Sequence, residues 1–119
     1  MTASDAMIES LIEVLAGLGP VKGRRMFGGA GLFADGVMFA LIADEVLYLK
    51  VDAANRGDFE AERLGPFTYQ SKGRPVELSY WRAPDRVLDD PDEMIKWAAR
   101  ALDVARKAAR AKTGAPIRR

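Results

Sequence analysis

Residues 37–42 read Val-Met-Phe-Ala-Leu-Ile, and this unbroken apolar run constrains the fold more than any other part of the chain. The run follows Asp35-Gly36, a pair typical of tight hairpin turns, so it is predicted to be a strand. Such a strand presents apolar side chains on both faces of a sheet, and exposing either face to water is costly. We therefore expect either two terminal helices on opposite faces, the arrangement we favour, or a second subunit on one face.

Both ends of the chain carry helical patterns. Apolar residues recur at helical spacing over residues 5–18, with Ser4 as a predicted N-cap and Gly19-Pro20 as a stop. Asp90, Pro91 and Glu93 open a second helix, predicted to run to about residue 112. The residues expected to pack this helix against a sheet are Met94, Ala98, Ala101, Ala105 and Ala108, with Trp97 and Leu102 beside them.

The middle of the chain is predicted to form strands. They are expected at residues 24–27, 32–34, 37–42 and 46–51, with a glycine bend at 28–29, and then as a hairpin of 67–69 with 76–81. Asp52 is expected to cap a short polar helix over residues 52–63. The predicted fold class is therefore α+β: a mainly antiparallel meander flanked by an N-terminal helix and a long C-terminal helix. We expect a single domain over residues 1–112 and a flexible basic tail over 113–119.

Composition excludes much chemistry. The chain of 119 residues has the size of one domain and contains neither histidine nor cysteine, so the commonest general base and the usual thiolate ligands are missing. We therefore expect no catalytic, cofactor or metal site, and no enzyme. The chain shows neither an apolar stretch long enough to span a bilayer nor a basic signal-peptide start, so the expected location is the cytoplasm, without membrane contact.

Residues 29–34 match the loose dinucleotide pattern G-x-G-x-x-A, and Asp52 follows at a suitable distance. In true dinucleotide sites a helix follows the glycines and places its N-terminus at the pyrophosphate, whereas here a turn and a strand follow. Glycines that ease a bend explain the pattern better. One alternative stays open: a small-molecule site at the bend of residues 28–31, with Arg25 and Lys50.

Basic residues form two groups. One follows the last helix at Lys96, Arg100, Lys107 and Arg110, and we favour a solvated helix face over a phosphate-binding stripe because the net charge is only +1. The other group combines cations with aromatic rings, which suits contacts with nucleic acid or a protein partner, although core or dimer packing of the rings is the simpler interpretation. The candidate contact residues are Lys22, Arg24, Arg25, Tyr48, Lys50, Lys72, Arg74 and Trp81.

Ordered motifs along the chain resemble the TfoX/Sxy family N-terminal domain. They are RMFGGAGLF at 25–33, DGVMFALI at 35–42, LYLKVD at 47–52, PFTY at 66–69, SYW at 79–81 with Pro84, and the last helix with Trp97, Ala98 and Ala101. The likeness covers about residues 5–110. The individual motifs are modest, but their order and spacing together are specific.

The resemblance implies a bacterial regulatory protein without enzymatic activity. The namesakes are positive regulators of natural competence genes that act with a cyclic-AMP-responsive transcription factor, so the expected partner is a protein, such as a transcription factor, or DNA. This chain ends near residue 119, and the helical C-terminal domain of the namesakes is not expected in it. The alternatives are a small-molecule-binding domain and a structural homodimer.

Overall fold

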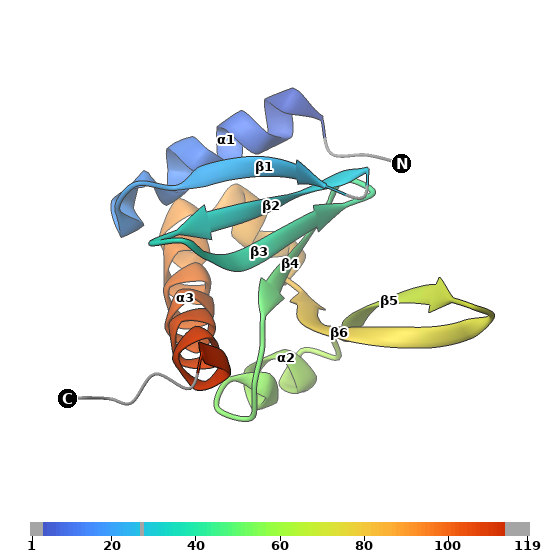
Figure 1. Ribbon diagram of the computed structural model, residues 1–119. Helices are drawn as coiled ribbons and strands as arrows, with labels where there is room; N and C mark the ends of the chain where they lie inside the picture. Colours follow the sequence, from blue (N-terminus) through green and yellow to red (C-terminus); the bar gives the residue numbers. More distant parts are fainter. Residues whose placement is uncertain (1–3, 27, 114–119) are drawn as a thin grey trace.

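The computed structural model of the chain describes residues 4–26 and 28–113 (Figure 1). It contains a six-stranded, fully antiparallel sheet with two long helices packed on it. The strand order is β1-β2-β3-β4-β6-β5. The helices are α1 (Asp5–Leu15), α2 (Arg56–Ala61) and α3 (Pro91–Thr113), with 3-10 turns η1 (Ala16–Leu18) and η2 (Asp85–Asp89). The strands are β1 (Lys22–Met26), β2 (Gly29–Ala34), β3 (Val37–Ala43), β4 (Val46–Lys50), β5 (Pro66–Ser71) and β6 (Arg74–Arg82). The α+β prediction is confirmed.

Local signals set the ends of these elements. The Ser4 side chain accepts a hydrogen bond from the Met7 backbone N–H at 3.1 Å, and Asp90 caps α3 in the same way through Glu93 N–H at 3.2 Å. Asp35 and Gly36 both have positive φ in the turn between β2 and β3, as do Lys72 and Gly73 between β5 and β6. The caps predicted at Ser4 and Asp90 and the hairpin turn predicted at Asp35-Gly36 are therefore confirmed. Phe27, predicted to end the first strand, lies outside the described residues, as does the predicted tail from residue 114 onward.

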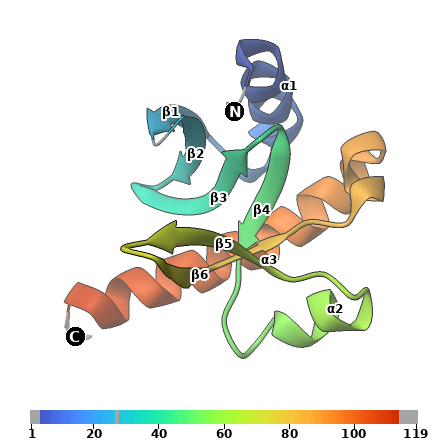
Figure 2. The same ribbon diagram turned by 90° about the vertical axis from the view of Figure 1, so that its right-hand side faces the viewer.

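Both long helices lie on the same face of the sheet. A side chain at Gly23 of β1 would meet Ile8 and Ile12 of α1, and Gly17 after α1 lies against Ile95 of α3. Residues of both helices share one buried cluster with β2, β3 and β4. In Figure 2 the β5–β6 hairpin points toward the viewer and α3 passes behind the strands. The expectation that the terminal helices cover opposite faces is therefore wrong, because they pack against each other as well as against the sheet.

A β-bulge explains how the two-sided strand β3 is accommodated. Leu32 pairs with Ala40, but Phe33 pairs with Met38, so Phe39 is an extra residue in β3. Phe39 and Ala40 are both fully buried in the core beneath the helices. The bulge thus moves one more large side chain of β3 to the helix side and leaves fewer for the other face.

Several details differ from the sequence predictions, and one of them is that β2 already begins at Gly29, within the predicted glycine bend. The polar helix is shorter than expected, because Asp52 caps a turn, accepting from Ala54 N–H at 2.7 Å, and α2 begins only at Arg56. The stripe of α3 ends early: Ala108 is exposed, while Val104, which was not predicted, is buried. The 3-10 turn η2 was also not predicted. Within the described residues, no helix is long and apolar enough to cross a membrane.

Candidate interaction surface

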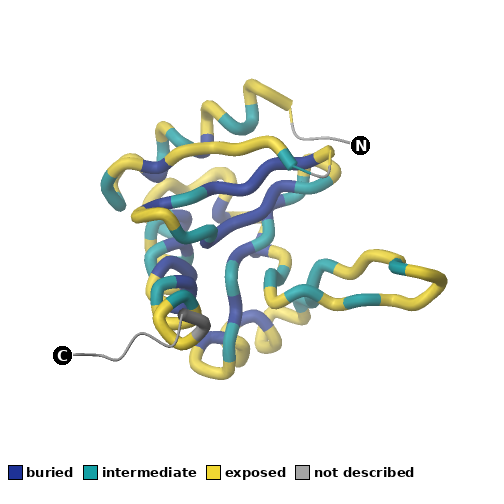
Figure 3. Tube along the Cα trace, viewed as in Figure 1, coloured by how far each residue is buried: buried dark blue, intermediate teal, exposed yellow. Residues whose placement is uncertain are grey.

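Strand alternation sorts the sheet residues into an inner face toward the helices and an outer face away from them. The cross-strand pairs Leu32–Ala40 and Ala40–Leu49 belong to the inner face, whereas Gly31–Leu41 and Leu41–Tyr48 belong to the outer face. Neither α1 nor α3 covers the outer face. Figure 3 shows β2 and β3 largely buried, while the β5–β6 hairpin is partly or fully exposed along its length. The outer face is therefore the side of the sheet that the two long helices leave uncovered.

An apolar groove of about 440 Å³ lies on the outer face, which we call the outer groove. Its lining comes from the adjacent ends of β1, β2 and β3 and from the β5–β6 hairpin: Met26, Gly29, Met38, Leu41, Ile42, Ala43, Phe67, Tyr69 and Leu78. Leu41 is only 6% exposed although no helix covers it. The Tyr69 side chain is 43% exposed at the hairpin side of the groove.

Glycines and aromatic rings shape this groove. A side chain at Gly31 would overlap the Met38 sulfur and come within 3.2 Å of Met26 Cε, so the two methionines occupy the space that the glycine leaves. On the other side, Tyr48 packs edge-on against Phe67 at 5.1 Å between ring centroids, and Phe67 stacks with Tyr69 at 6.3 Å. These ring contacts join β4 to β5, and Phe67 and Tyr69 form the hairpin side of the groove.

Cations surround the outer groove. Lys22 and Arg24 share the outer face of β1 with Met26, and Arg74 shares the outer face of the hairpin with Tyr69 and Val76. Lys50 lies on the outer face of β4, opposite Tyr80 and between these two groups in the strand order, and Arg82 pairs with Asp85 at 3.2 Å. No carboxylate occurs on the outer face among the described strand residues, because their single acidic residue, Glu77, pairs with Thr68 on the inner side. The outer strand face is therefore uniformly basic.

Tyr80 ties the two halves of the sheet together beneath this surface. Its hydroxyl donates a hydrogen bond to the carbonyl oxygen of Met38 next to the bulge, at 2.8 Å. The Lys50 ammonium lies 4.9 Å from the centroid of the Tyr80 ring and donates to the Ser79 hydroxyl at 2.6 Å. Burial raises the pKa of Tyr80 to about 12, because the phenolate would lose its hydration.

Tyr80 predicts a loss of stability at alkaline pH. An unfolded tyrosine ionises near pH 10, but the folded Tyr80 keeps its proton to about 12, so the unfolded state binds fewer protons between these values and stability falls as pH rises through them. We expect Tyr80→Phe to lose about 1 kcal/mol at neutral pH, from the missing hydrogen bond. The absorbance titration of the variant should also lack the ionisation step near pH 12 that belongs to Tyr80. Urea unfolding at neutral pH and an absorbance titration check both points; an unchanged final titration step would contradict this role.

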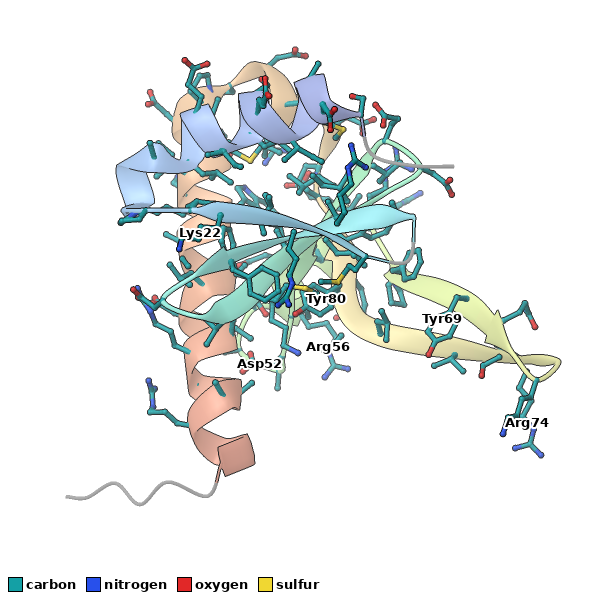
Figure 4. The ribbon with its side chains drawn as sticks, turned by 45° about the horizontal axis from the view of Figure 1, so that its top comes forward. Lys22, Asp52, Arg56, Tyr69, Arg74 and Tyr80 are labelled. Carbon is teal, nitrogen blue, oxygen red and sulfur yellow. The ribbon has the colours of Figure 1, made fainter. Side chains whose placement is uncertain are left out.

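The structure separates residues that the sequence grouped. Lys22 and Arg24 lie on edge strand β1 and Lys72 and Arg74 at the tip of the hairpin, at opposite ends of the sheet order (Figure 4). All four side chains are exposed. They therefore lie on two sides of the outer face and do not form one cluster. Tyr48 and Lys50 lie between them on β4, partly buried.

Two further candidates point away from the outer face. Arg25 lies on the helix side of β1, where its guanidinium forms an ion pair with Asp5. Trp81 pairs with Leu49 and packs against the core, with its ring edge-on to Phe59 at 6.3 Å between centroids. The core packing that the sequence favoured for the rings is found for Trp81, because the alternation of β6 places Tyr80 outside and Trp81 inside.

The structure does not assemble the small-molecule site predicted at the glycine bend. Arg25 points to the inner face and Lys50 to the outer face, and they belong to strands separated by β2 and β3. Gly29 has no room for a ligand group, because even a single added carbon would overlap the carbonyl oxygen of Ile42. Gly29 and Gly31 lie within β2 and the next element is β3, so no helix N-terminus is available for a phosphate.

The basic stripe of α3 is partly neutralised by carboxylates. Arg100 pairs with Asp58 at 3.1 Å, Lys96 approaches Glu93 at 3.6 Å, and Arg106 pairs with Asp35 and Asp103. This supports the interpretation as a solvated helix face over a phosphate-binding stripe.

A second ionic network joins η2 to α2 and α3. Arg86 donates to Glu62 at 2.8 Å, contacts Glu93 at 3.5 Å and lies over the ring of Trp97. The hydrogen bond from Arg86 lowers the pKa of Glu62. Among the described residues, no group of acidic side chains is arranged to hold a metal ion. We assign this network to the docking of α2 and η2 onto α3.

Sequence reasoning missed most of the outer groove. Met26, Leu78 and Tyr69 were not candidates, and they meet only because the hairpin returns beside β4 and tilts over β3. One signal was available: Met38 and Leu41 belong to the run that is apolar on both faces. That run predicted an outer apolar surface without showing what borders it.

Comparisons with known proteins agree with the motifs. The pattern described as the TfoX N-terminal domain matches residues 13–105. The chain is 31% identical over 97 residues to protein Sxy of Escherichia coli (strain K12), covering 80% of this chain and 46% of that protein. It is 26% identical over 98 residues to DNA transformation protein TfoX1 of Aliivibrio fischeri, covering 82% of this chain and 47% of that protein. The chain thus spans about half the length of these curated relatives.

Proposed function

Because the chain belongs to the TfoX N-terminal domain family, we propose that it is a non-enzymatic regulatory domain that acts in transcription through contacts made by its outer face. The proposed setting is the cytoplasm. The process suggested by the relatives is the regulation of DNA transformation, since one of them is named a DNA transformation protein.

The outer groove and its cations carry this proposal. A sheet face that both helices leave uncovered, with an apolar centre and only basic strand residues around it, has the composition of a surface that binds a negatively charged partner. Such a partner is either a protein, such as a transcription factor, or DNA. Tyr48 and Lys50 also belong to the outer face, on strand β4 between β3 and β6, and extend the same surface.

The residue types present also favour binding over catalysis. The sequence contains no histidine or cysteine, so a hydroxyl nucleophile would lack its usual base. The titratable side chain on the outer face with a markedly raised pKa, Tyr80, is held in a hydrogen bond to a backbone carbonyl. That bond gives it a structural role.

Deleting the gene tests the proposal. We expect the deletion to lower a defined set of transcripts, and expression of this chain in trans to restore them, since a co-regulator acts through transcript levels. RNA sequencing of the parent, deletion and complemented strains provides the measurement. Unchanged transcripts in the deletion strain, under conditions where the parent makes the protein, would contradict a regulatory role.

A further inference from the structure

We propose that the outer groove binds an acidic amphipathic peptide segment of a protein partner, with apolar side chains in the groove and carboxylates against the surrounding cations. This inference rests on the proposed function and adds the chemistry of the partner. It follows from three properties of the surface: the apolar lining, the sign of the charges and the shape of the groove.

The lining favours apolar side chains over a small metabolite. Small-molecule sites are also mainly apolar, but they carry a few precisely placed polar groups that converge on the ligand and orient it. Here the polar side-chain group in the lining is the Tyr69 hydroxyl, at the exposed side, while Met26, Met38, Leu41 and Leu78 supply the floor. Methionine side chains adapt to differently shaped apolar partners. Burial of leucine- or phenylalanine-like groups here would contribute the binding free energy.

The charges around the groove indicate that the bound segment carries a negative charge. Arg24 lies two residues from Met26 on the same face of β1, and Arg74 lies on the hairpin beside the Tyr69–Val76 pair, so cations flank the groove from both sides. The nearest carboxylates along the chain are Asp44 and Glu45 in the turn after Ala43, beyond the end of β3, and Glu45 accepts from Ser4 N–H on the helix side. Carboxylates of the segment would therefore meet cations on either side of the groove.

The same charges argue against a second copy of this chain. A two-fold dimer through the outer faces would bring Arg24, Lys50 and Arg74 of both subunits close together, and such like charges repel. Nucleic acid fits less well than a peptide, because its phosphates would contact the cations and leave the methionine and leucine floor of the groove without an apolar partner.

A set of labelled peptides tests the inference by fluorescence anisotropy. The probe is a synthetic peptide in which leucine and phenylalanine alternate with glutamate; one counterpart has lysine in place of glutamate, and a second has serine in place of the apolar residues. A single-stranded oligonucleotide is the fourth probe. We expect binding of the acidic apolar peptide, weakened by salt, and at least about tenfold weaker binding of the other three.

Two matched pairs of variants locate the site. Tyr69→Asp places a negative charge at the groove. Leu88→Asp makes the same change at the other exposed large apolar residue in the described part of the chain, which lies in η2 on the helix side. Arg24→Glu reverses a charge beside the groove, and Lys107→Glu reverses a charge at an exposed position of α3. We expect Tyr69→Asp and Arg24→Glu to weaken peptide binding about tenfold and their controls to leave it unchanged.

Several results would overturn the inference. Equal binding of the acidic and basic peptides would remove the role of charge, and equal loss in Leu88→Asp and Tyr69→Asp would move the site elsewhere. Preferential binding of the oligonucleotide would identify nucleic acid instead. Sedimentation showing a dimer that Tyr69→Asp dissociates would identify a second copy. A failed peptide test with transcripts still dependent on the gene would refute the inference and leave the proposed function standing.

Discussion

Gly29→Ala is expected to destabilise the protein by about 3 kcal/mol, near the upper end of the usual cost of overpacking. Gly29 is buried where β2 begins, and an added Cβ would overlap the Ile42 carbonyl oxygen and lie 3.2 Å from its carbonyl carbon. These are backbone atoms of β3, so relief requires the two strands to move apart. Movement there would disturb the β2–β3 pairing and the wall of the outer groove.

Two other glycine variants serve as controls. Gly57→Ala in α2 meets no atom within 4 Å, so it should be neutral or stabilising by up to about 1 kcal/mol through helix propensity. Gly31→Ala meets the flexible side chains of Met38 and Met26, so its cost should fall between the two. Urea unfolding of the three variants provides the measurement. A cost for Gly29→Ala no greater than that of Gly31→Ala would show that β2 and β3 are not packed backbone to backbone.

Local chemistry explains which predictions of the fold succeeded. Helix caps and hairpin turns depend on residues only a few positions apart, so a short stretch of sequence is enough to predict them. This holds for the caps at Ser4 and Asp90 and for the turns at Asp35-Gly36 and Lys72-Gly73. The alternation of residues 46–51 likewise indicates that Leu47 and Leu49 share one face of a strand, and both are buried in the structure.

Long-range packing explains which predictions failed. A helical stripe shows that α1 has an apolar side, but not which face of the sheet it covers, and the contact of Gly17 with Ile95 could not be read from either helix alone. The bulge at Phe39 depends on pairing between β2 and β3, which a single strand pattern does not reveal. The placement of both helices on one face leaves the outer face uncovered, and the bulge reduces the number of large β3 side chains on that outer face.

The candidate residues show the same division. Basic residues were recognised by type, yet their grouping failed because β1 and β5 occupy opposite edges of the sheet, and Trp81 faces the core. The outer groove combines residues from five segments of chain that only the strand order brings together. Side-chain type indicated a binding surface, and topology decided its location.

Tyr69→Asp is expected to abolish the regulatory activity of the protein while leaving it folded. The side chain is 43% exposed, so a polar replacement costs little in stability, but the new carboxylate would both remove the ring from the outer groove and repel an acidic partner. Leu88→Asp is the matched control, because Leu88 is 50% exposed and lies on the helix side. Circular dichroism and immunoblotting would establish equal folding and abundance.

The most direct measurement of the central claim is therefore transcript abundance in the deletion strain complemented with each variant. If the outer face is the working surface, the Leu88→Asp protein will restore the dependent transcripts to the level of the unaltered protein, and the Tyr69→Asp protein will leave them at the level of the empty vector. Full restoration by Tyr69→Asp at equal abundance would contradict the account.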